Sequence, residues 1–211
     1  MRALLLSDVE NPALWDYYKP EKVAGIDLII SCGDLKREYL EFLVTMTNRP
    51  VLYVPGNHDK GYVEAPPEGC ENLDDTVFTF RGVRFMGLGG CKRYNEGPYQ
   101  YTEKEMRRRI RKMRWKLRRA RGVDVIVTHA APTGCGDRQD IAHRGFDCFL
   151  TLMERYHPQY LLHGHVHMNY DSDIPRRMTY QETTVINAYD RYILEIPDGV
   201  EPTRRKRHHF T

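Results

Sequence analysis

Three consecutive residues, Asn57, His58 and Asp59, carry side chains that could do chemistry together. Asn57 offers a neutral carbonyl oxygen to a metal ion, and the imidazole of His58 can give or take a proton near pH 7. Asp59 could hold that imidazole in one tautomer. The three follow an apolar run at residues 51–54 that a Pro-Gly pair ends abruptly, which is typical of a buried strand that delivers functional groups to a loop. The alternative is an ordinary polar turn.

Carboxylates follow two other apolar runs. Asp8 and Glu10 come shortly after residues 1–6, and because they are two positions apart on an extended backbone they point the same way. Two converging carboxylates repel unless a cation lies between them. Asp34 follows residues 26–31 and a glycine turn. For Asp8 and Glu10, the alternative is the N-cap and acidic first turn of a helix.

Histidines follow two further runs. His129 comes directly after residues 123–128, and a short strand at residues 160–162 leads into His163, His165 and His167. Three histidines in five residues are rare by chance. His165 and His167 alternate around one residue and could face one centre, whereas His163 belongs to the strand and is the poorest ligand candidate.

Polar groups that could bind a metal or move a proton thus follow all of these runs: Asp8, Glu10, Asp34, Asn57, His58, His129, His165 and His167. Three carboxylates, one amide and four imidazoles suit two divalent ions that share a carboxylate. A structural zinc site would need thiolates at fixed spacing, and these are absent. The nucleophile elbow, the P-loop and the dinucleotide fingerprint are absent as well.

Periodicity places these groups in one α/β domain. Residues 35–48 show a helical apolar stripe between two of the strands, which predicts a parallel strand–helix–strand unit. Further elements are expected as a hairpin at 76–80 and 83–88, a helix at 146–157 and strands near 183–187 and 192–196. We expect one domain over residues 1–200 and a basic, disordered tail over residues 201–211.

The composition is that of a globular protein with little overall charge. Of 211 residues, 41% are apolar and 29% are charged, and the net charge is only +3, so the molecule as a whole is not a strong polyanion binder. Five dispersed cysteines without a C-x-x-C pair indicate reduced thiols. The apolar run at the N-terminus is far too short for a signal sequence or a membrane span. We therefore expect a cytoplasmic protein without a membrane partner.

Residues 102–121 are the most basic stretch of the chain. Thr102 and Glu105 match a capping box at the start of a helix. A narrow apolar stripe runs along this helix: Met106, Ile110, Met113 and Leu117. Nearly all the remaining positions are Arg or Lys, with Trp115 off the stripe, and this face could follow the phosphates of a nucleic acid or bind an acidic partner. The alternative is a solvated helix without a partner.

Taken in order, the motifs resemble those of the calcineurin-like metallophosphoesterases. The matching pieces are the strand end at Asp8, then Gly33-Asp34, Gly56-Asn57-His58-Asp59, His129 and Gly164-His165-Val166-His167. The resemblance runs from residue 1 to about residue 196, and all five pieces in order are highly specific. It implies a four-layer α/β/β/α sandwich of two mixed β-sheets flanked by helices, with the motifs on loops at one edge.

The resemblance also implies a role for each residue. The metal ligands would be Asp8 and His167 for the first ion, Asn57, His129 and His165 for the second, and Asp34 shared by both. His58 would protonate the leaving oxygen or stabilise the phosphoryl group, and Asp59 would orient it. Two cations would hold the phosphate while a bridging hydroxide attacks phosphorus in line.

Glu10 departs from the family pattern. The first motif of the family is Asp-x-His, whereas this chain has Asp8-Val9-Glu10. If Glu10 binds the first metal, a hard anionic oxygen replaces an imidazole, and we expect a preference for Mn²⁺, Mg²⁺ or Fe²⁺, with Zn²⁺ as a further candidate. The alternative is that Glu10 does not bind and that the first site is weak.

These patterns predict a metal-dependent phosphoester hydrolase that prefers phosphodiesters to phosphomonoesters. The alternatives are a nuclease that uses the arginine-rich helix, or a scaffold or nucleic-acid-binding protein with little or no catalysis. Loops at 60–75, 91–101 and 133–145 are expected to shape the pocket. The candidate phosphate contacts are Arg138, His143 and Arg144. Loop tyrosines such as Tyr94 could stack on a substrate ring or be ordinary half-buried aromatics.

Overall fold

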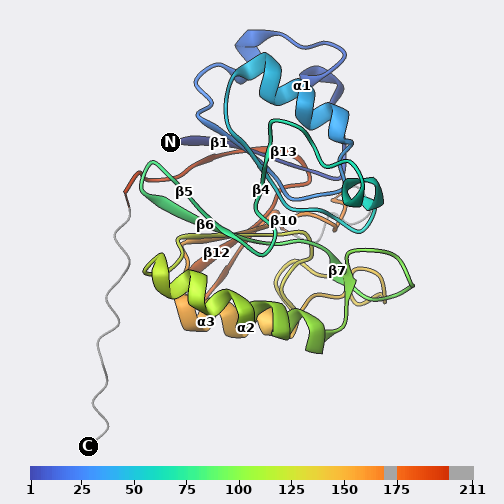
Figure 1. The fold of residues 1–211 in the computed structure, drawn as a ribbon, viewed down its shortest axis with the longest axis vertical. Coiled ribbons are helices and arrows are strands. Elements are labelled where there is room, and N and C mark those ends of the chain that lie inside the picture. Colours follow the sequence, from blue (N-terminus) through green and yellow to red (C-terminus); the bar gives the residue numbers. More distant parts are fainter. Residues whose placement is uncertain (169–174, 200–211) are drawn as a thin grey trace, which may run out of the picture.

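Two β-sheets packed face to face form the centre of the computed structural model, which describes residues 1–168 and 175–199 (Figure 1). The five strands of the first sheet are, in spatial order, β13 (Asp190–Glu195), β1 (Arg2–Ser7), β2 (Leu28–Ser31), β3 (Val51–Tyr53) and β4 (Glu71–Asn72). The six strands of the second are β11 (Arg177–Tyr180), β12 (Thr183–Asn187), β10 (Tyr160–His163), β9 (Val125–Thr128), β6 (Val83–Leu88) and β5 (Val77–Phe80). Strands β7 (Cys91–Lys92) and β8 (Gln100–Tyr101) form a separate pair.

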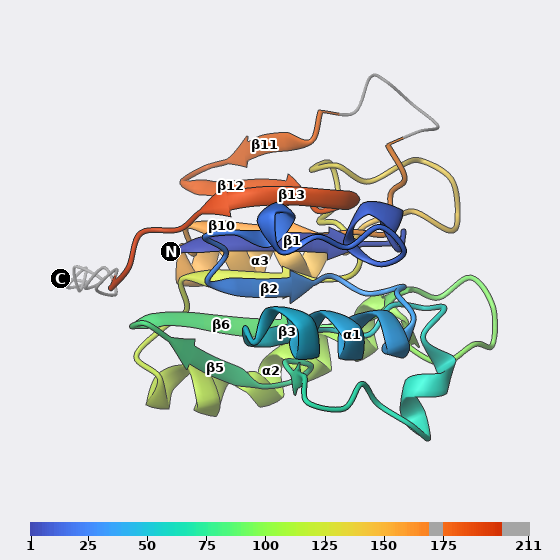
Figure 2. The same cartoon turned by 90° about the horizontal axis from the view of Figure 1, so that it is seen from above.

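Helices cover the outer face of each sheet. Helix α1 (Arg37–Thr47) lies over the first sheet, and α2 (Glu103–Arg119) and α3 (Asp147–Tyr156) lie over the second (Figure 1). The strands of the two sheets run in similar directions (Figure 2). The predicted four-layer sandwich of two mixed sheets is confirmed.

The strands are buried on both faces, which explains why they read as continuous apolar runs. In β2, Leu28 and Ile30 pack into the core between the sheets, whereas Ile29 packs toward α1. In β9, Val125 and Val127 face the core between the sheets and Ile126 faces α2 and α3.

Parallel pairing brings the polar strand ends together. Strands β1 to β4 are parallel to one another, and so are β12, β10, β9 and β6. The parallel unit β2–α1–β3 and the antiparallel hairpin β5–β6 are confirmed. Because the carboxyl ends of parallel strands share one edge of a sheet, the loops that follow them meet at one end of the sandwich.

Helix α2 is anchored by more than its apolar stripe. The capping box of Thr102 and Glu105 is present, and Met106, Met113 and Leu117 are buried. Arg109, which belonged to the predicted cationic outer face, is buried instead. Its guanidinium forms ion pairs with two neighbouring carboxylates, Asp74 and Asp75, and donates to the carbonyl of Gly89.

A buried ion pair also ties β6 to the start of β9. Arg84 and Asp124 are both less than a tenth exposed, and Nε of Arg84 donates to Oδ2 of Asp124 over 2.7 Å. The backbone N–H of Arg84 donates to the same oxygen over 2.8 Å. The guanidinium also donates to the carbonyl of Arg121, just past the end of α2. One pair thus joins the second sheet to the helix that covers it.

Three further observations bear on the sequence-based expectations. The five cysteines are free thiols. Among the described residues, no helix has the length and hydrophobicity that crossing a bilayer requires. The tail predicted for residues 201–211 lies outside the described residues.

Candidate metal centre

Each of the strands β1, β2 and β10 is followed within a few residues by a site residue with unusual backbone geometry. Asp8, Asp34 and His165 have φ values of 67°, 57° and 65°. Residues other than glycine rarely adopt this left-handed conformation, and where they do, the surrounding structure must compensate for the strain. This backbone conformation directs the side chains of all three residues toward the same centre.

Glycines let the motif loops approach closely. A Cβ atom on Gly56 would lie 2.1 Å from Oδ1 of Asp34, and one on Gly164 would lie 1.8 Å from Oγ of Ser7. Both distances are far below van der Waals contact. The glycines of the Gly-Asn-His-Asp and Gly-His motifs are therefore needed for space, since neither has the positive φ that favours glycine.

We predict that Gly56→Ala lowers kcat/KM for the phosphoester hydrolysis expected from the sequence at least tenfold, because the new methyl group must displace the Asp34 carboxylate. Gly61→Ala is the matched control, since a Cβ there meets nothing within 4 Å. Steady-state kinetics of the two variants with bis-p-nitrophenyl phosphate make the comparison. Equal activity of both variants would contradict the close packing of Gly56 on Asp34.

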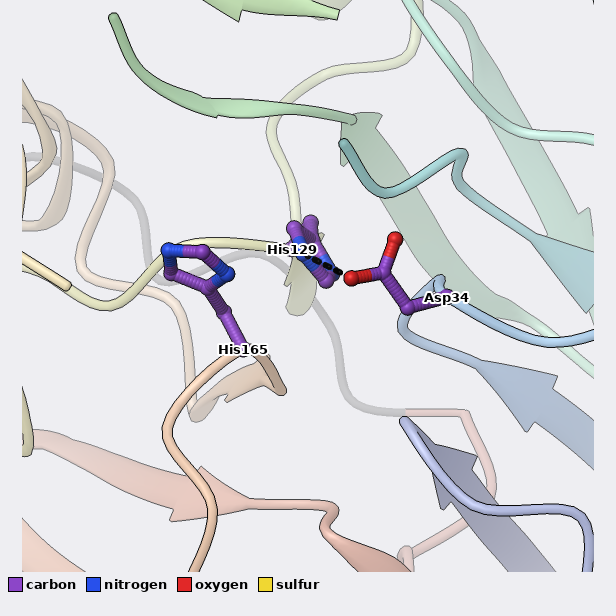
Figure 3. Close-up of side chains that lie close together, drawn as sticks. All are labelled: Asp34, His129 and His165. Carbon is purple, nitrogen blue, oxygen red and sulfur yellow. Dashed lines mark ion pairs between the residues drawn. The ribbon is translucent and has the colours of Figure 1, made fainter. Parts of the chain in front are cut away.

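Asp34, His129 and His165 form the heart of the centre. Each offers one ligand atom, and these atoms lie within 4.8 Å of one another (Figure 3). Nε2 of His129 is 3.3 Å from Oδ2 of Asp34. Nδ1 of His129 donates to the carbonyl of Cys32 over 2.7 Å, which fixes the ring with Nε2 toward the centre. Nε2 of His165 donates to the carbonyl of Ala142 over 2.8 Å, which leaves Nδ1 as its ligand atom.

Asn57 joins this group from the loop after β3. Its Oδ1 lies 3.0 Å from Nε2 of His129, and its amide nitrogen donates to the hydroxyl of Tyr94 over 3.1 Å. The Tyr94 contact holds the Asn57 side chain in place beside His129. Tyr94 is therefore a positioning residue, a role that its place in a loop did not reveal.

Asp8 and His167 lie beside the group. The Asp8 side chain is only 1% exposed, and its Oδ1 is 3.8 Å from Nε2 of His167. The backbone N–H of His165 donates to both carboxylate oxygens of Asp8, over 3.1 and 3.0 Å. The structure thus brings together six of the seven predicted metal ligands, all except Glu10: Asp8, Asp34, Asn57, His129, His165 and His167.

The electrostatics of these residues suit a divalent cation. Burial raises the pKa of Asp8, and the neighbouring charge of Asp34 adds to the increase. Burial alone would raise the pKa of Asp34 too, but His129 lowers it to about 2. Burial disfavours the charged form of His129, yet Asp34 raises its pKa to about 9. Two buried carboxylates need positive charge nearby, which the His129 imidazolium supplies in the absence of an ion. The donor set of carboxylate, amide oxygen and imidazole suits a divalent cation that would take over this role.

His165 differs from His129. Burial and the charge of His129 lower the pKa of His165 to about 3. The ring is thus neutral over the whole physiological range, which is the form that binds metals. His163 lies within β10, buried in the second sheet, and accords with the prediction that it is part of the strand.

His58 and Asp59 occupy different environments. The His58 side chain is 75% exposed at the mouth of the centre, and its Nε2 is 4.0 Å from Oδ2 of Asp34. Asp59 is buried, and its Oδ2 accepts from the backbone N–H groups of Asp34 and Gly56 over 2.8 and 2.7 Å. These hydrogen bonds hold two motif loops together, and the expected role of Asp59 in orienting the His58 ring stays a prediction.

Glu10 follows β1 in the sequence, and its side chain contacts the start of α1. Its Oε1 accepts from the backbone N–H of Lys36 over 2.9 Å, where a helix N-terminus leaves donors unsatisfied. Glu10 also lines a groove of about 500 Å³ together with Asp34 and His58. Its second oxygen has no hydrogen bond to a described residue, and its binding of the first metal stays a prediction.

The predicted phosphate contacts are distributed unevenly around the centre. The ring of His143 is centred 5.0 Å from that of His165, and its Nδ1 is 2.8 Å from Oδ1 of Asp140. Arg138 lies 3.7 Å from the other oxygen of Asp140. Arg144 is exposed. Sequence reasoning missed Lys36 and Arg37, two cations that line the groove beside Asp34. Their position at a helix start gave no sign of this.

A sequence model described as "Calcineurin-like phosphoesterase" matches residues 1–169, most of the chain. The chain belongs to this family. Among curated proteins, the UPF0046 protein K07C11.7 of Caenorhabditis elegans is 26% identical, over 77% of this chain and 62% of that protein. This phosphoesterase chain therefore spans less than two thirds of that relative.

Solved structures share the fold of the calcineurin-like chain. One superposes with a TM-score of 0.65 at 16% identity, covering 92% of this chain and 94% of the other. The protein TT1561 of Thermus thermophilus superposes with a TM-score of 0.60 at 18% identity, covering 90% and 89%. At these identities the likeness concerns the fold.

Proposed function

We propose that this calcineurin-like phosphoesterase hydrolyses phosphodiesters with two divalent metal ions. The observation that carries the proposal is the convergence of Asp34, His129 and His165. Asp34 would be shared by the two ions, Asp8 and His167 would complete one site, and Asn57, His129 and His165 the other. Divalent ions in this position polarise a phosphate and make water more acidic. Mn²⁺, Mg²⁺ and Fe²⁺ suit these oxygen and imidazole ligands, and Zn²⁺ is a further candidate.

The groove beside the centre supports a diester as substrate. The groove has a volume of about 500 Å³ and extends from Asp34 and His58 along the start of α1. A phosphomonoester has one organic substituent, whereas a diester has two, and a groove of this size has room for the second. Lys36 and Arg37 in its lining favour an anionic or polar group there.

Hydrolysis of bis-p-nitrophenyl phosphate and of p-nitrophenyl phosphate, each with Mn²⁺, Mg²⁺ or Zn²⁺, tests this preference. We expect a kcat/KM for the diester at least tenfold above that for the monoester with the preferred metal. A monoester preference would contradict the diester assignment while leaving the metal-dependent activity in place. Bound metal without turnover of either ester would favour the scaffold alternative.

We propose that His58 acts as the proton donor or the phosphoryl contact of the reaction. Its ring is exposed next to the buried ligands, and its backbone N–H donates to Asp34 Oδ1 over 2.8 Å, so the loop is held in place independently of the side chain. His58→Ala should therefore lower kcat about a hundredfold or more while the bound metal content stays unchanged. Kinetics together with elemental analysis separate these effects, and a large loss of metal would show that His58 is a ligand instead.

A further inference from the structure

A second groove, about 910 Å³ in volume, lies between the C-terminal half of α2 and the C-terminal end of α3. Figure 1 shows the two helices side by side beneath the six-stranded sheet. The floor of the groove is formed by the residues that precede β9 and β10, such as Val123 and Gln159. The groove is therefore formed by regular elements of the fold, and the sheet beneath it is the one that carries part of the metal centre.

The groove is strongly cationic. Its lining includes Arg111, Lys112, Arg114, Arg118, Arg121 and Arg155. None of these six forms an ion pair with a described residue. The lining also contains two acidic residues, and each lies beside a basic side chain of the same groove: Asp124 pairs with Arg84, and an oxygen of Glu182 lies 3.5 Å from Nδ1 of His157.

The charge pattern of α2 also argues against a merely solvated helix. Ten of the fifteen residues from Arg107 to Arg121 are Arg or Lys, and none is acidic. Solvated helices gain stability from opposite charges three or four positions apart, and like charges at these spacings destabilise the helix. The positive charges on the outer face of α2 therefore repel one another, and an anionic partner bound there would reduce this repulsion.

Trp115 lies in the wall of this groove with 71% of its surface exposed. The groove also includes Tyr156. An exposed indole among arginines gives a flat apolar face next to positive charge. Nucleic-acid bases stack on such faces while the phosphates follow the cations, which is how single strands are bound without sequence preference.

The cationic groove and the metal centre lie at opposite ends of the same strands. Asp124 precedes β9 and His129 follows it, and Gln159 precedes β10 while His165 follows it. A strand of four residues spans about 13 Å. A group bound in the cationic groove is therefore not the group that reacts at the metal centre.

We propose that the cationic groove between α2 and α3 binds single-stranded nucleic acid, with Trp115 stacking on a base and the arginines contacting phosphates. Charge complementarity and the exposed indole carry this inference. An acidic peptide would use the charge but would have no base to stack on Trp115. The binding does not depend on the proposed hydrolysis, because the two sites are separate.

Fluorescence anisotropy of the 211-residue chain with a labelled oligothymidylate of about 12 nucleotides tests the proposal. We expect Trp115→Ala to weaken binding about tenfold. The combined change of Arg111, Arg114 and Arg118 to Ala should reduce the slope of log affinity against log salt by about 2. Both variants should hydrolyse bis-p-nitrophenyl phosphate like the unchanged protein, which also shows that they are folded.

A matched control removes three charges from the same helix outside the groove: Lys104, Arg108 and Arg119 to Ala. The basic segment 201–211 is present in every variant, so its contribution cancels. The control should bind at least ten times more tightly than the groove variant. Equal affinity of the two triple variants would overturn the groove as the site. Tighter binding of a polyglutamate peptide, unaffected by Trp115→Ala, would overturn nucleic acid as the ligand.

Discussion

Asp34→Asn is expected to lower kcat/KM for metal-dependent phosphodiester hydrolysis about a thousandfold or more. The replacement keeps the shape of the side chain, and its carbonyl oxygen can still accept from the backbone of His58. It removes the negative charge that faces His129 and that would be shared by two cations. Divalent ions should therefore bind less tightly as well, since a charged ligand is replaced by a neutral one.

Steady-state kinetics and elemental analysis of the purified variant measure both losses. Asp16→Asn is the control, because Asp16 is exposed in a turn and belongs neither to the candidate ligands nor to the lining of the adjacent groove. It should keep full activity and metal content. An Asp34→Asn protein with more than a tenth of the original kcat/KM would rule out Asp34 as a shared ligand.

Asp124→Ala is expected to lower the free energy of unfolding by about 3–5 kcal/mol. The change leaves the guanidinium of Arg84 buried without its counter-charge, and the backbone N–H of Arg84 loses its acceptor. The guanidinium would keep its hydrogen bond to the carbonyl of Arg121 but no opposite charge, and the buried backbone N–H would have no acceptor. The contact between β6, β9 and the end of α2 should loosen as a result.

Urea denaturation followed by circular dichroism measures this loss. The matched control is Glu195→Ala, which breaks the exposed ion pair between Arg2 and Glu195 on the first sheet. That change should cost less than about 1 kcal/mol, because exposed pairs are screened by water. Similar losses in the two variants would contradict a structural role for burial of the Arg84–Asp124 pair.

The layers of the fold could be predicted because their strands are buried on both faces. Residues 26–31 and 123–128 are nearly continuous apolar runs, and such runs reveal a strand without its neighbours. Strands β4 and β11 were not predicted, because β4 is two exposed polar residues and β11 alternates exposed and half-buried positions. Such edge strands are defined by their partners in space, which local sequence does not specify.

The convergence of the candidate metal ligands could be predicted because these residues follow strand ends in a fixed order. The supporting residues could not. Asp59 follows His58 in sequence and suggested a side-chain pair, yet its hydrogen bonds go to the backbone of Asp34 and Gly56. Arg109 looked like part of a charged surface, and only the tertiary structure brings Asp74 and Asp75 to it. Long-range contacts of this kind leave no periodic signal in the chain.

The most direct test of the proposed metal centre is a titration of the metal-free protein with Mn²⁺ while hydrolysis of bis-p-nitrophenyl phosphate is followed. We predict no turnover in the presence of chelator and a rise in kcat that reaches its plateau when two ions are bound per chain. Turnover that persists in chelator, or a protein that holds two ions and does not hydrolyse the ester, would contradict a metal-dependent phosphodiesterase at this centre.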